Sequence, residues 1–181
     1  GAIGILTALI LYSRKTKEDL FWIFDRIVIA VAFSGFCIRM GNLMNSEIVG
    51  KPTTLPWGFR FIGCAEDVGV AEAAIPARHP SQLYEALYCI VLLVLFYWLW
   101  KNKRAVLPKG FMFGLFCVLL FTFRFSIEFT KEVQESFEKA LPIDMGQILS
   151  IPFVLIGIGM MVYAKKKNIF HAVRTEMPAE N

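Results

Sequence analysis

Four near-continuous apolar stretches, each roughly 20 residues long, most restrict what this chain can fold into. They cover residues 20–38, 83–100, 111–130 and 145–164. About 20 apolar residues in a helix cross ~30 Å of hydrocarbon, so each stretch is predicted to span a membrane. Residues 1–12 are also apolar but shorter, and are interpreted as part of a cut helix. The predicted fold is an all-α integral membrane protein, a polytopic bundle of about four full spans plus one partial span.

The overall composition agrees with this class. Of 181 residues, 56% are hydrophobic and 19% are charged, whereas a soluble domain carries about 25% charged residues. The four cysteines form no Cys-x-x-Cys pair, so neither a metal site nor a disulfide framework is predicted. They are interpreted as small buried hydrophobes.

The placement of the basic residues predicts the orientation of the bundle. If successive spans alternate in direction, three basic segments fall on one face: residues 14–17, 101–109 and 165–174. The positive-inside rule places this face in the cytoplasm. We therefore predict a transmembrane core at residues 1–164, a small extracytoplasmic cap at about 39–82 with short strands such as 59–62, and a cytoplasmic tail at 165–181. A lysine-rich tail after a membrane helix is an anchor, so no nucleic acid is expected as a partner.

Unusual polar residues gather at the predicted outer ends of the spans. They are Arg39, Asn42, Asn45, Glu47, Arg78, His79, Gln82, Tyr84, Glu85, Arg124, Glu128 and Gln147. Ionisable groups at this depth are costly, which makes them a functional-site hypothesis. Arginine offers a planar fork of donors matched to phosphate oxygens. An arginine cluster beside lipid therefore suits a phospholipid head group.

Several of these residues also have a purely structural interpretation. Arg124 and Glu128 are four residues apart on one helix face and could form an ion pair that ties helices together. His79 is a candidate acid or base because imidazole titrates near neutrality. Pro80 after it favours a helix start, and with it a capping or positioning role. Asp25 and Arg26, at the other end, are interpreted as structural or snorkelling residues. Gly157 and Gly159 are interpreted as helix-packing residues.

Four motifs, in order, resemble those of bacterial prolipoprotein diacylglyceryl transferases. Residues 39–50 have the pattern Arg-x-Gly-Asn-x-x-Asn-x-Glu-x-x-Gly, and residues 78–85 read Arg-His-Pro-Ser-Gln-Leu-Tyr-Glu. Residues 123–129 have the pattern Phe-Arg-x-x-x-Glu-Phe, and residues 146–150 the pattern Gly-Gln-x-Leu-Ser. The resemblance covers about residues 1–164, and its first two motifs together are highly specific.

The resemblance implies an enzyme of bacterial lipoprotein maturation in the cytoplasmic (inner) membrane, with its site on the outer side. Such enzymes transfer the diacylglyceryl group of phosphatidylglycerol to the lipobox cysteine in the signal peptide of a prolipoprotein. A thioether forms and glycerol phosphate leaves, with no cofactor. It implies that Arg39 and Arg124 bind the phosphate and stabilise the leaving group, and that Glu128 orients Arg124 or contacts the head group. The remaining polar residues given above, together with Gly50 and Lys131, would line the substrate site. The implied partners are phosphatidylglycerol, the prolipoprotein signal peptide and membrane lipid.

Two departures from the family pattern affect these expectations. The family has a His-Gly-Gly motif at the helix that opens this chain, and Gly1 follows where the histidine would stand. The chain by itself is therefore expected to be inactive. Lys131 stands where many members carry arginine, and it keeps the charge but loses the bidentate fork.

Two other classes of function remain in competition with a transferase. A transporter or channel with an outer-face anion site would use Arg39, Arg124 and Glu128 along a polar path, with ionisable residues on the inner half as well. A non-catalytic membrane scaffold would need the polar clusters only for stability.

Overall fold

The computed structural model describes residues 2–64, 67–131 and 144–170. These residues form five α-helices, α1 (Ala2–Thr16), α2 (Leu20–Met44), α3 (Ser81–Lys103), α4 (Phe111–Ile127) and α5 (Met145–Lys167). Two short 3₁₀ helices, η2 (Glu72–Ala74) and η3 (Glu128–Thr130), lie between them. Four helical segments are long and apolar enough to cross a membrane: Leu20–Met44, Ser81–Lys103, Phe111–Thr130 and Met145–Lys167. The prediction of an all-helical bundle with four full spans is confirmed.

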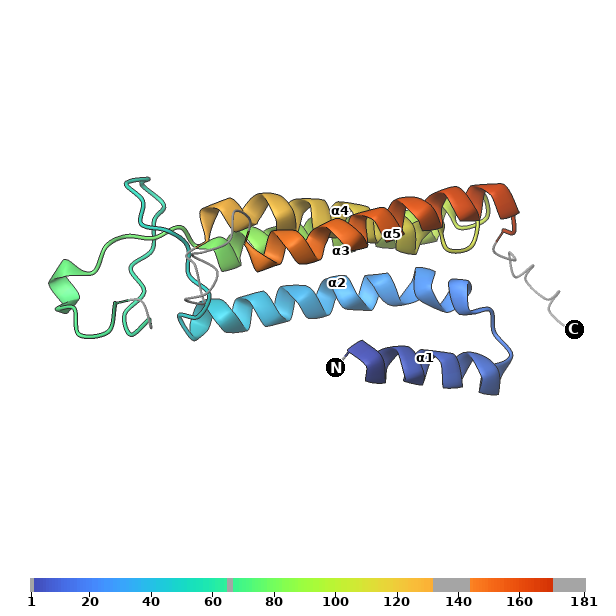
Figure 1. Cartoon of the computed structure of the whole chain (residues 1–181), viewed down its shortest axis with the longest axis horizontal. Helices are drawn as coiled ribbons and strands as arrows, with labels where there is room; N and C mark the ends of the chain where they lie inside the picture. The colour runs from blue at the N-terminus through green and yellow to red at the C-terminus, as the bar shows by residue number, and fades with distance from the viewer. Residues whose placement is uncertain (1, 65–66, 132–143, 171–181) are drawn as a thin grey trace, which may run out of the picture.

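The helices run antiparallel to their sequence neighbours (Figure 1). α2 packs on α3, and α4 packs on α5, while α1 contacts α2. The C-terminal ends of α1, α3 and α5 therefore lie at one end of the bundle, here called the basic end (Figure 1). The opposite end, here called the cap end, carries the long α2–α3 connection. The predicted grouping of the three basic segments is confirmed for the described residues.

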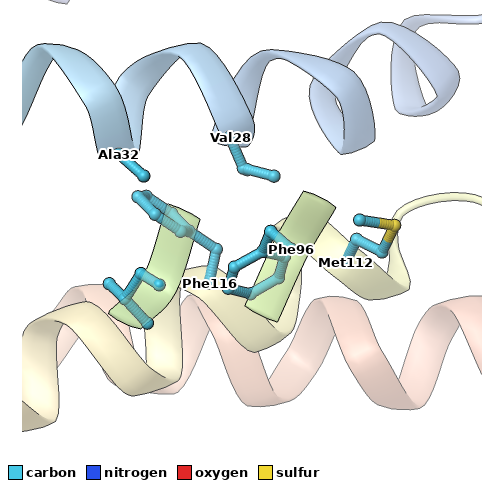
Figure 2. Packing of buried hydrophobic residues seen from close by; sticks show 6 residues of the cluster. Val28, Ala32, Phe96, Met112 and Phe116 are labelled. Atoms are coloured by element: carbon cyan, nitrogen blue, oxygen red, sulfur yellow. The ribbon is translucent and has the colours of Figure 1, made fainter. Parts of the chain in front are cut away.

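The core of the bundle lies where α2, α3 and α4 meet. Figure 2 shows Val28 and Ala32 of α2 facing Phe96 of α3 and Met112 and Phe116 of α4. Each of these side chains is at most 5% exposed. Phe96 and Phe116 pack edge to face, with ring centroids 5.5 Å apart. This geometry is favourable because the positive edge of one ring meets the negative face of the other.

Asp25 ties α2 to the start of α4. Its side chain is fully buried, and its two carboxylate oxygens accept hydrogen bonds from the backbone N–H groups of Gly110 at 2.6 Å and Phe113 at 2.8 Å. The first N–H groups of a helix have no partner within the helix, so a carboxylate from a neighbouring helix satisfies them. Gly110 has φ +88°, which favours glycine at this position. The structural interpretation of Asp25 is confirmed.

α4 and α5 approach closely at a pair of glycines. A Cβ atom added to Gly157 would lie 2.7 Å from the backbone oxygen of Gly114, and a Cβ atom added to Gly114 would lie 2.7 Å from the oxygen of Gly157. Gly159 faces open space, with nothing within 4 Å of an added Cβ. The packing interpretation is confirmed for Gly157, whereas Gly159 makes no such contact among the described residues.

The α2–α3 connection folds back on itself through backbone hydrogen bonds. Phe59 and Arg78 exchange two of them, at 2.9 and 2.8 Å, and Val49, Phe61 and Cys64 form a small buried cluster under the connection. Only isolated bridges occur here among the described residues, so the expected strand at 59–62 is not formed. Pro52, a bridge partner of Arg78, has no N–H to extend the pairing.

Some predicted boundaries fall within a helix or outside the described residues. α2 continues through Arg39 and Asn42 to Met44, so the predicted cap at about 39–82 begins within the last turns of a helix. Gly41 does not end the helix, because the intrahelical hydrogen bonds continue to Asn45. Most of the second outer connection, 132–143, and the end of the tail, 171–181, lie outside the described residues.

Candidate active site

A chain of alternating charges crosses the cap end of the bundle. Glu85, in the second turn of α3, lies between Arg39 of α2 and Lys131, which follows η3. Its Oε1 accepts a hydrogen bond from Lys131 Nζ at 3.0 Å, and its Oε2 lies 3.1 Å from Arg39 Nε. Lys131 Nζ also lies 3.5 Å from Glu128 Oε2. These four side chains, here called the charge network, join residues that are distant in the sequence.

The charge network is withdrawn from the surface. The side chains of Glu85 and Lys131 are 7% and 4% exposed, and those of Arg39 and Glu128 are 17% and 15% exposed. Oε2 of Glu85 accepts no hydrogen bond in the described part of the chain, because its contact with Arg39 Nε is close but poorly aligned. Charge attraction, rather than a well-directed hydrogen bond, holds this pair together.

The charge network borders a cavity of about 200 Å³ between α2, α3 and α4. Arg39, Glu85 and Arg124 form its polar wall, and most of the remaining lining is aromatic or aliphatic. Tyr88 and Phe123 stack in that wall with ring centroids 3.9 Å apart. Ala32 and Phe116 belong both to this lining and to the core, so the cavity begins where core packing ends. A site with two guanidinium groups above apolar walls can hold an anion attached to hydrocarbon.

Arg124 and Glu128 do not form the ion pair that their spacing allowed. Glu128 pairs with Lys131 instead, and the Arg124 side chain has no ion pair or hydrogen bond with any residue that the structure describes. α4 ends at Ile127, and Glu128 starts the tighter η3 turn, which brings Lys131 rather than Arg124 to the carboxylate. The Glu128 carboxyl group also packs on Gly146, where an added Cβ would lie 2.5 Å from Glu128 Cδ.

Arg78 lies in the cap and not in the charge network. Its Nε and Nη2 donate to the two carboxylate oxygens of Asp67 at 3.0 and 2.8 Å, and Nη1 donates to the Gly50 backbone oxygen at 3.4 Å. The Cys64 thiol donates to Asp67 Oδ2 at 3.1 Å. These hydrogen bonds, from Arg78 first and then Cys64, hold the pKa of Asp67 below its usual value. Among the described contacts, Arg78 stabilises the cap rather than lining the cavity.

His79 and Tyr84 form a second polar group at the start of α3. Tyr84 Oη accepts a hydrogen bond from Trp57 Nε1 at 2.9 Å and lies 3.4 Å from His79 Nδ1. α3 begins at Ser81, with Pro80 as its N-cap residue. The predicted helix start is confirmed, and His79 contacts Tyr84 rather than the cavity.

Gly50 and Gln82 pack the cap against the bundle. An added Cβ at Gly50 would lie 2.5 Å from the His79 backbone oxygen, so a larger residue would push the two segments apart. Gln82 is fully buried, and its Nε2 donates to the Glu47 backbone oxygen at 2.7 Å. Its Oε1 has no hydrogen-bond partner among the described residues.

The other predicted site residues lie at the same end but make fewer contacts. Asn45 and Glu47 are exposed, and Asn42 is half-buried. Gln147 Nε2 donates to the Phe125 backbone oxygen at 3.4 Å, which links α5 to α4. The structure therefore brings Arg39, its partner Glu85 and Arg124 to one cavity, while the other predicted site residues lie outside its lining.

Sequence reasoning missed two residues that the structure places near these groups. Tyr88 lines the cavity, and its position one helical turn after Glu85 on α3 could have indicated this. Asp67 pairs with Arg78 across the cap. It lies in an irregular connection, where no periodicity marks it.

Known proteins resemble this chain along most of its length. The chain matches the family described as prolipoprotein diacylglyceryl transferase over residues 1–163. A phosphatidylglycerol–prolipoprotein diacylglyceryl transferase of Bacteroides fragilis is 44% identical over 170 residues, covering 93% of this chain and 58% of that protein. Proteins with the same name from Porphyromonas gingivalis and Tolumonas auensis are 43% and 42% identical, covering 93% and 92% of this chain and 62% and 61% of those proteins. The chain spans about three fifths of the length of these curated relatives. On this similarity, the chain belongs to the prolipoprotein diacylglyceryl transferase family.

Proposed function

We propose that the protein transfers the diacylglyceryl group of phosphatidylglycerol to the lipobox cysteine of a prolipoprotein. The observation that carries the proposal is the cavity at the cap end, where Arg39 and Arg124 stand above apolar walls. The phosphate of the lipid would contact the guanidinium groups, and hydrocarbon would lie against the walls. Membership in the transferase family supports the same substrates.

The arrangement of the charge network supports a role for Arg39 in phosphate binding. Glu85 contacts Arg39 at Nε, and neither Nη1 nor Nη2 has a partner among the described residues. The outer edge of the guanidinium is therefore available for two phosphate oxygens. Lys131 holds the other oxygen of Glu85, which keeps the carboxylate beside Arg39. Glu85 and Lys131 are positioning residues in this proposal.

The chemistry follows from the charges that change during transfer. The cysteine sulfur, as thiolate, forms a bond to the terminal glyceryl carbon of the diacylglyceryl group. The bond between that carbon and the phosphate oxygen breaks, and its electron pair leaves with glycerol phosphate. Negative charge therefore grows on a phosphate oxygen, where fixed guanidinium groups stabilise it most. Arg39 and Arg124 are the groups that we assign to this task.

The test is substitution in the full-length protein. Arg39→Ala and Arg124→Ala are each expected to lower turnover of a lipobox peptide with phosphatidylglycerol by at least ~100-fold, the order seen when one transition-state donor is lost. Arg60→Ala is the matched control, because Arg60 is an exposed cap arginine outside the cavity lining. Unchanged turnover in both test variants would refute these roles. Solute flux through liposomes without lipid transfer would favour the transporter.

We also propose that the cap end faces the outside of the cell and the basic end the cytoplasm. The support is the grouping of arginines and lysines at the ends of α1, α3 and α5, which is typical of cytoplasmic loops. A fluorescent protein that folds only in the cytoplasm, fused after Asn181, should fluoresce. A dark fusion of normal abundance would reverse the orientation.

A further inference from the structure

Two arginines share one tryptophan ring at the basic end, far from the candidate active site. Arg26 Cζ lies 4.3 Å from the centre of the Trp22 ring and 5.3 Å from that of Trp100. Arg104 Cζ lies 5.9 Å from the same Trp100 ring. The aromatic rings attract the guanidinium faces, but like charges gathered around one ring repel each other. An anion between the two side chains would relieve that repulsion.

Within the part of the chain that the structure describes, no carboxylate at this end forms an ion pair with Arg26 or Arg104. Asp25 accepts from the backbone of Gly110 and Phe113, and Asp19 caps α2 and lies 3.9 Å from Lys109. Arg26 has no ion pair with any residue of the described chain. The described contacts of the Arg26 guanidinium are with the two rings, so its N–H donors remain available for an acceptor.

Arg26 also lies between two grooves that flank α2. One groove, of about 420 Å³, lies between α1 and α2 and is lined by Leu9, Ile23 and Ile27. The other, of about 490 Å³, lies between α2 and α3 and is lined by Ala30, Phe33 and Leu93. Arg26 lines both, and Trp22 and Trp100 each line one. This arrangement of one cation between two apolar grooves matches a lipid with an anionic head group and two acyl chains.

We propose that Arg26 and Arg104 bind the phosphate of an anionic phospholipid in the leaflet at the basic end, with one acyl chain in each groove. Basic pockets between membrane helices at such an end are suited to anionic head groups. Lys101 and Lys103 at the end of α3 add positive charge nearby, which favours a net-negative lipid over a zwitterionic one. Arg26 and Arg39 are 13 positions apart on α2, or about 20 Å along the helix, so this site is separate from the cavity.

The experiment counts lipids that stay bound to the full-length protein. Delipidated protein carrying Arg39→Ala and Arg124→Ala, which weakens anion binding at the cap end, is titrated with phosphatidic acid or phosphatidylcholine. Native mass spectrometry then measures the bound lipid. Phosphatidic acid is expected to bind more tightly than phosphatidylcholine. Adding Arg26→Gln and Arg104→Gln should weaken its binding by roughly thirtyfold, since each basic residue near an anionic lipid contributes about 1 kcal/mol.

Two further variants distinguish a specific lipid site from general attraction of the lipid to the positive charge at this end. Adding Lys15→Gln and Lys166→Gln instead removes the same charge from exposed positions at the same end, and should change the affinity less than threefold. Ala30→Phe fills one groove without changing charge, and should weaken binding of phosphatidic acid that carries full-length acyl chains. Equal losses in the two charge variants would overturn the proposal. Equal affinity for phosphatidic acid and phosphatidylcholine would also overturn it. The same holds if no lipid binds because another segment of the protein covers the grooves.

Discussion

Glu85→Gln removes the negative charge that lies between Arg39 and Lys131, and we expect it to destabilise the cap end of the bundle. The change keeps the size of the side chain. Lys131, which is 4% exposed, would retain an ion pair only with Glu128, at the longer distance of 3.5 Å. Arg39 would lose its ion pair at Nε. Two cations would then share a poorly solvated region with a single carboxylate.

The magnitude follows from the distance and the burial. Two unit charges 3.0 Å apart, as in Glu85 and Lys131, attract by roughly 5–6 kcal/mol at an effective dielectric constant of about 20. Desolvation of both groups offsets part of that attraction, but it is not recovered when one partner alone is removed. Breaking a buried pair typically costs about 3–5 kcal/mol. We therefore expect Glu85→Gln to lower the free energy of unfolding by about 3 kcal/mol.

A double-mutant cycle with Lys131→Gln isolates the pair. Unfolding free energies would be measured by denaturant titration in detergent micelles for the wild type, both single variants and the double variant. The double variant should be less destabilised than the sum of the two single variants by about 1–3 kcal/mol. Glu72→Gln, an exposed carboxylate of the cap, is the control and should change stability by less than about 0.5 kcal/mol. Additive single effects, or wild-type stability of Glu85→Gln, would refute the reasoning.

Three further predictions concern helix packing, the cap and the tie between α2 and α4. Gly157→Ala should destabilise the protein by about 1–3 kcal/mol, because the new methyl group meets the Gly114 backbone oxygen. Gly159→Ala is the control and should be neutral or stabilising by up to about 1 kcal/mol. Equal thermal stability of the two variants would contradict this prediction. Asp67→Asn should cost about 1.5–3 kcal/mol near neutral pH. The pKa of Asp67 is lowered on folding, so this stabilisation is complete above about pH 4 and is lost as pH falls through the folded pKa. The melting temperatures of the wild type and the variant should therefore converge in acid. A difference in melting temperature that stays constant with pH would be evidence against this role of Asp67. Asp25→Asn leaves one backbone N–H at the start of α4 without its acceptor and should lower the free energy of unfolding by about 1–3 kcal/mol. The folded enzyme should keep its turnover. A large loss of turnover at full stability would overturn the structural role of Asp25.

The spans could be predicted because a membrane imposes a simple requirement on sequence. A helix must be apolar for about 20 residues and must satisfy its own backbone hydrogen bonds. The stretches at 83–100 and 145–164 therefore lie within α3 and α5 as observed. The end of α2 was less predictable, because polar residues such as Arg39 and Asn42 remain helical once the chain has passed the apolar stretch.

The membership of the candidate site was predictable, but its pairing was not. Arg39, Glu85, Arg124 and Glu128 were all selected from the sequence because ionisable groups at a membrane boundary are costly. Their spacing on one helix suggested Arg124 and Glu128 as partners. The structure pairs Glu128 with Lys131 and Glu85 with Arg39, because partner choice depends on which helix ends meet.

Sequence alone determined that this chain forms apolar helices long enough to span a membrane, which ends of these helices are basic, and which polar residues gather at the opposite ends. Each of these properties is local, since hydropathy and charge act over one helix length. Only the tertiary structure decided that Arg39 and Arg124 line one cavity, that Arg78 pairs with Asp67, and that Arg26 meets Trp100. These contacts join residues on different helices or on opposite sides of the cap, and their distances are fixed by how the helices pack rather than by any interval along the chain.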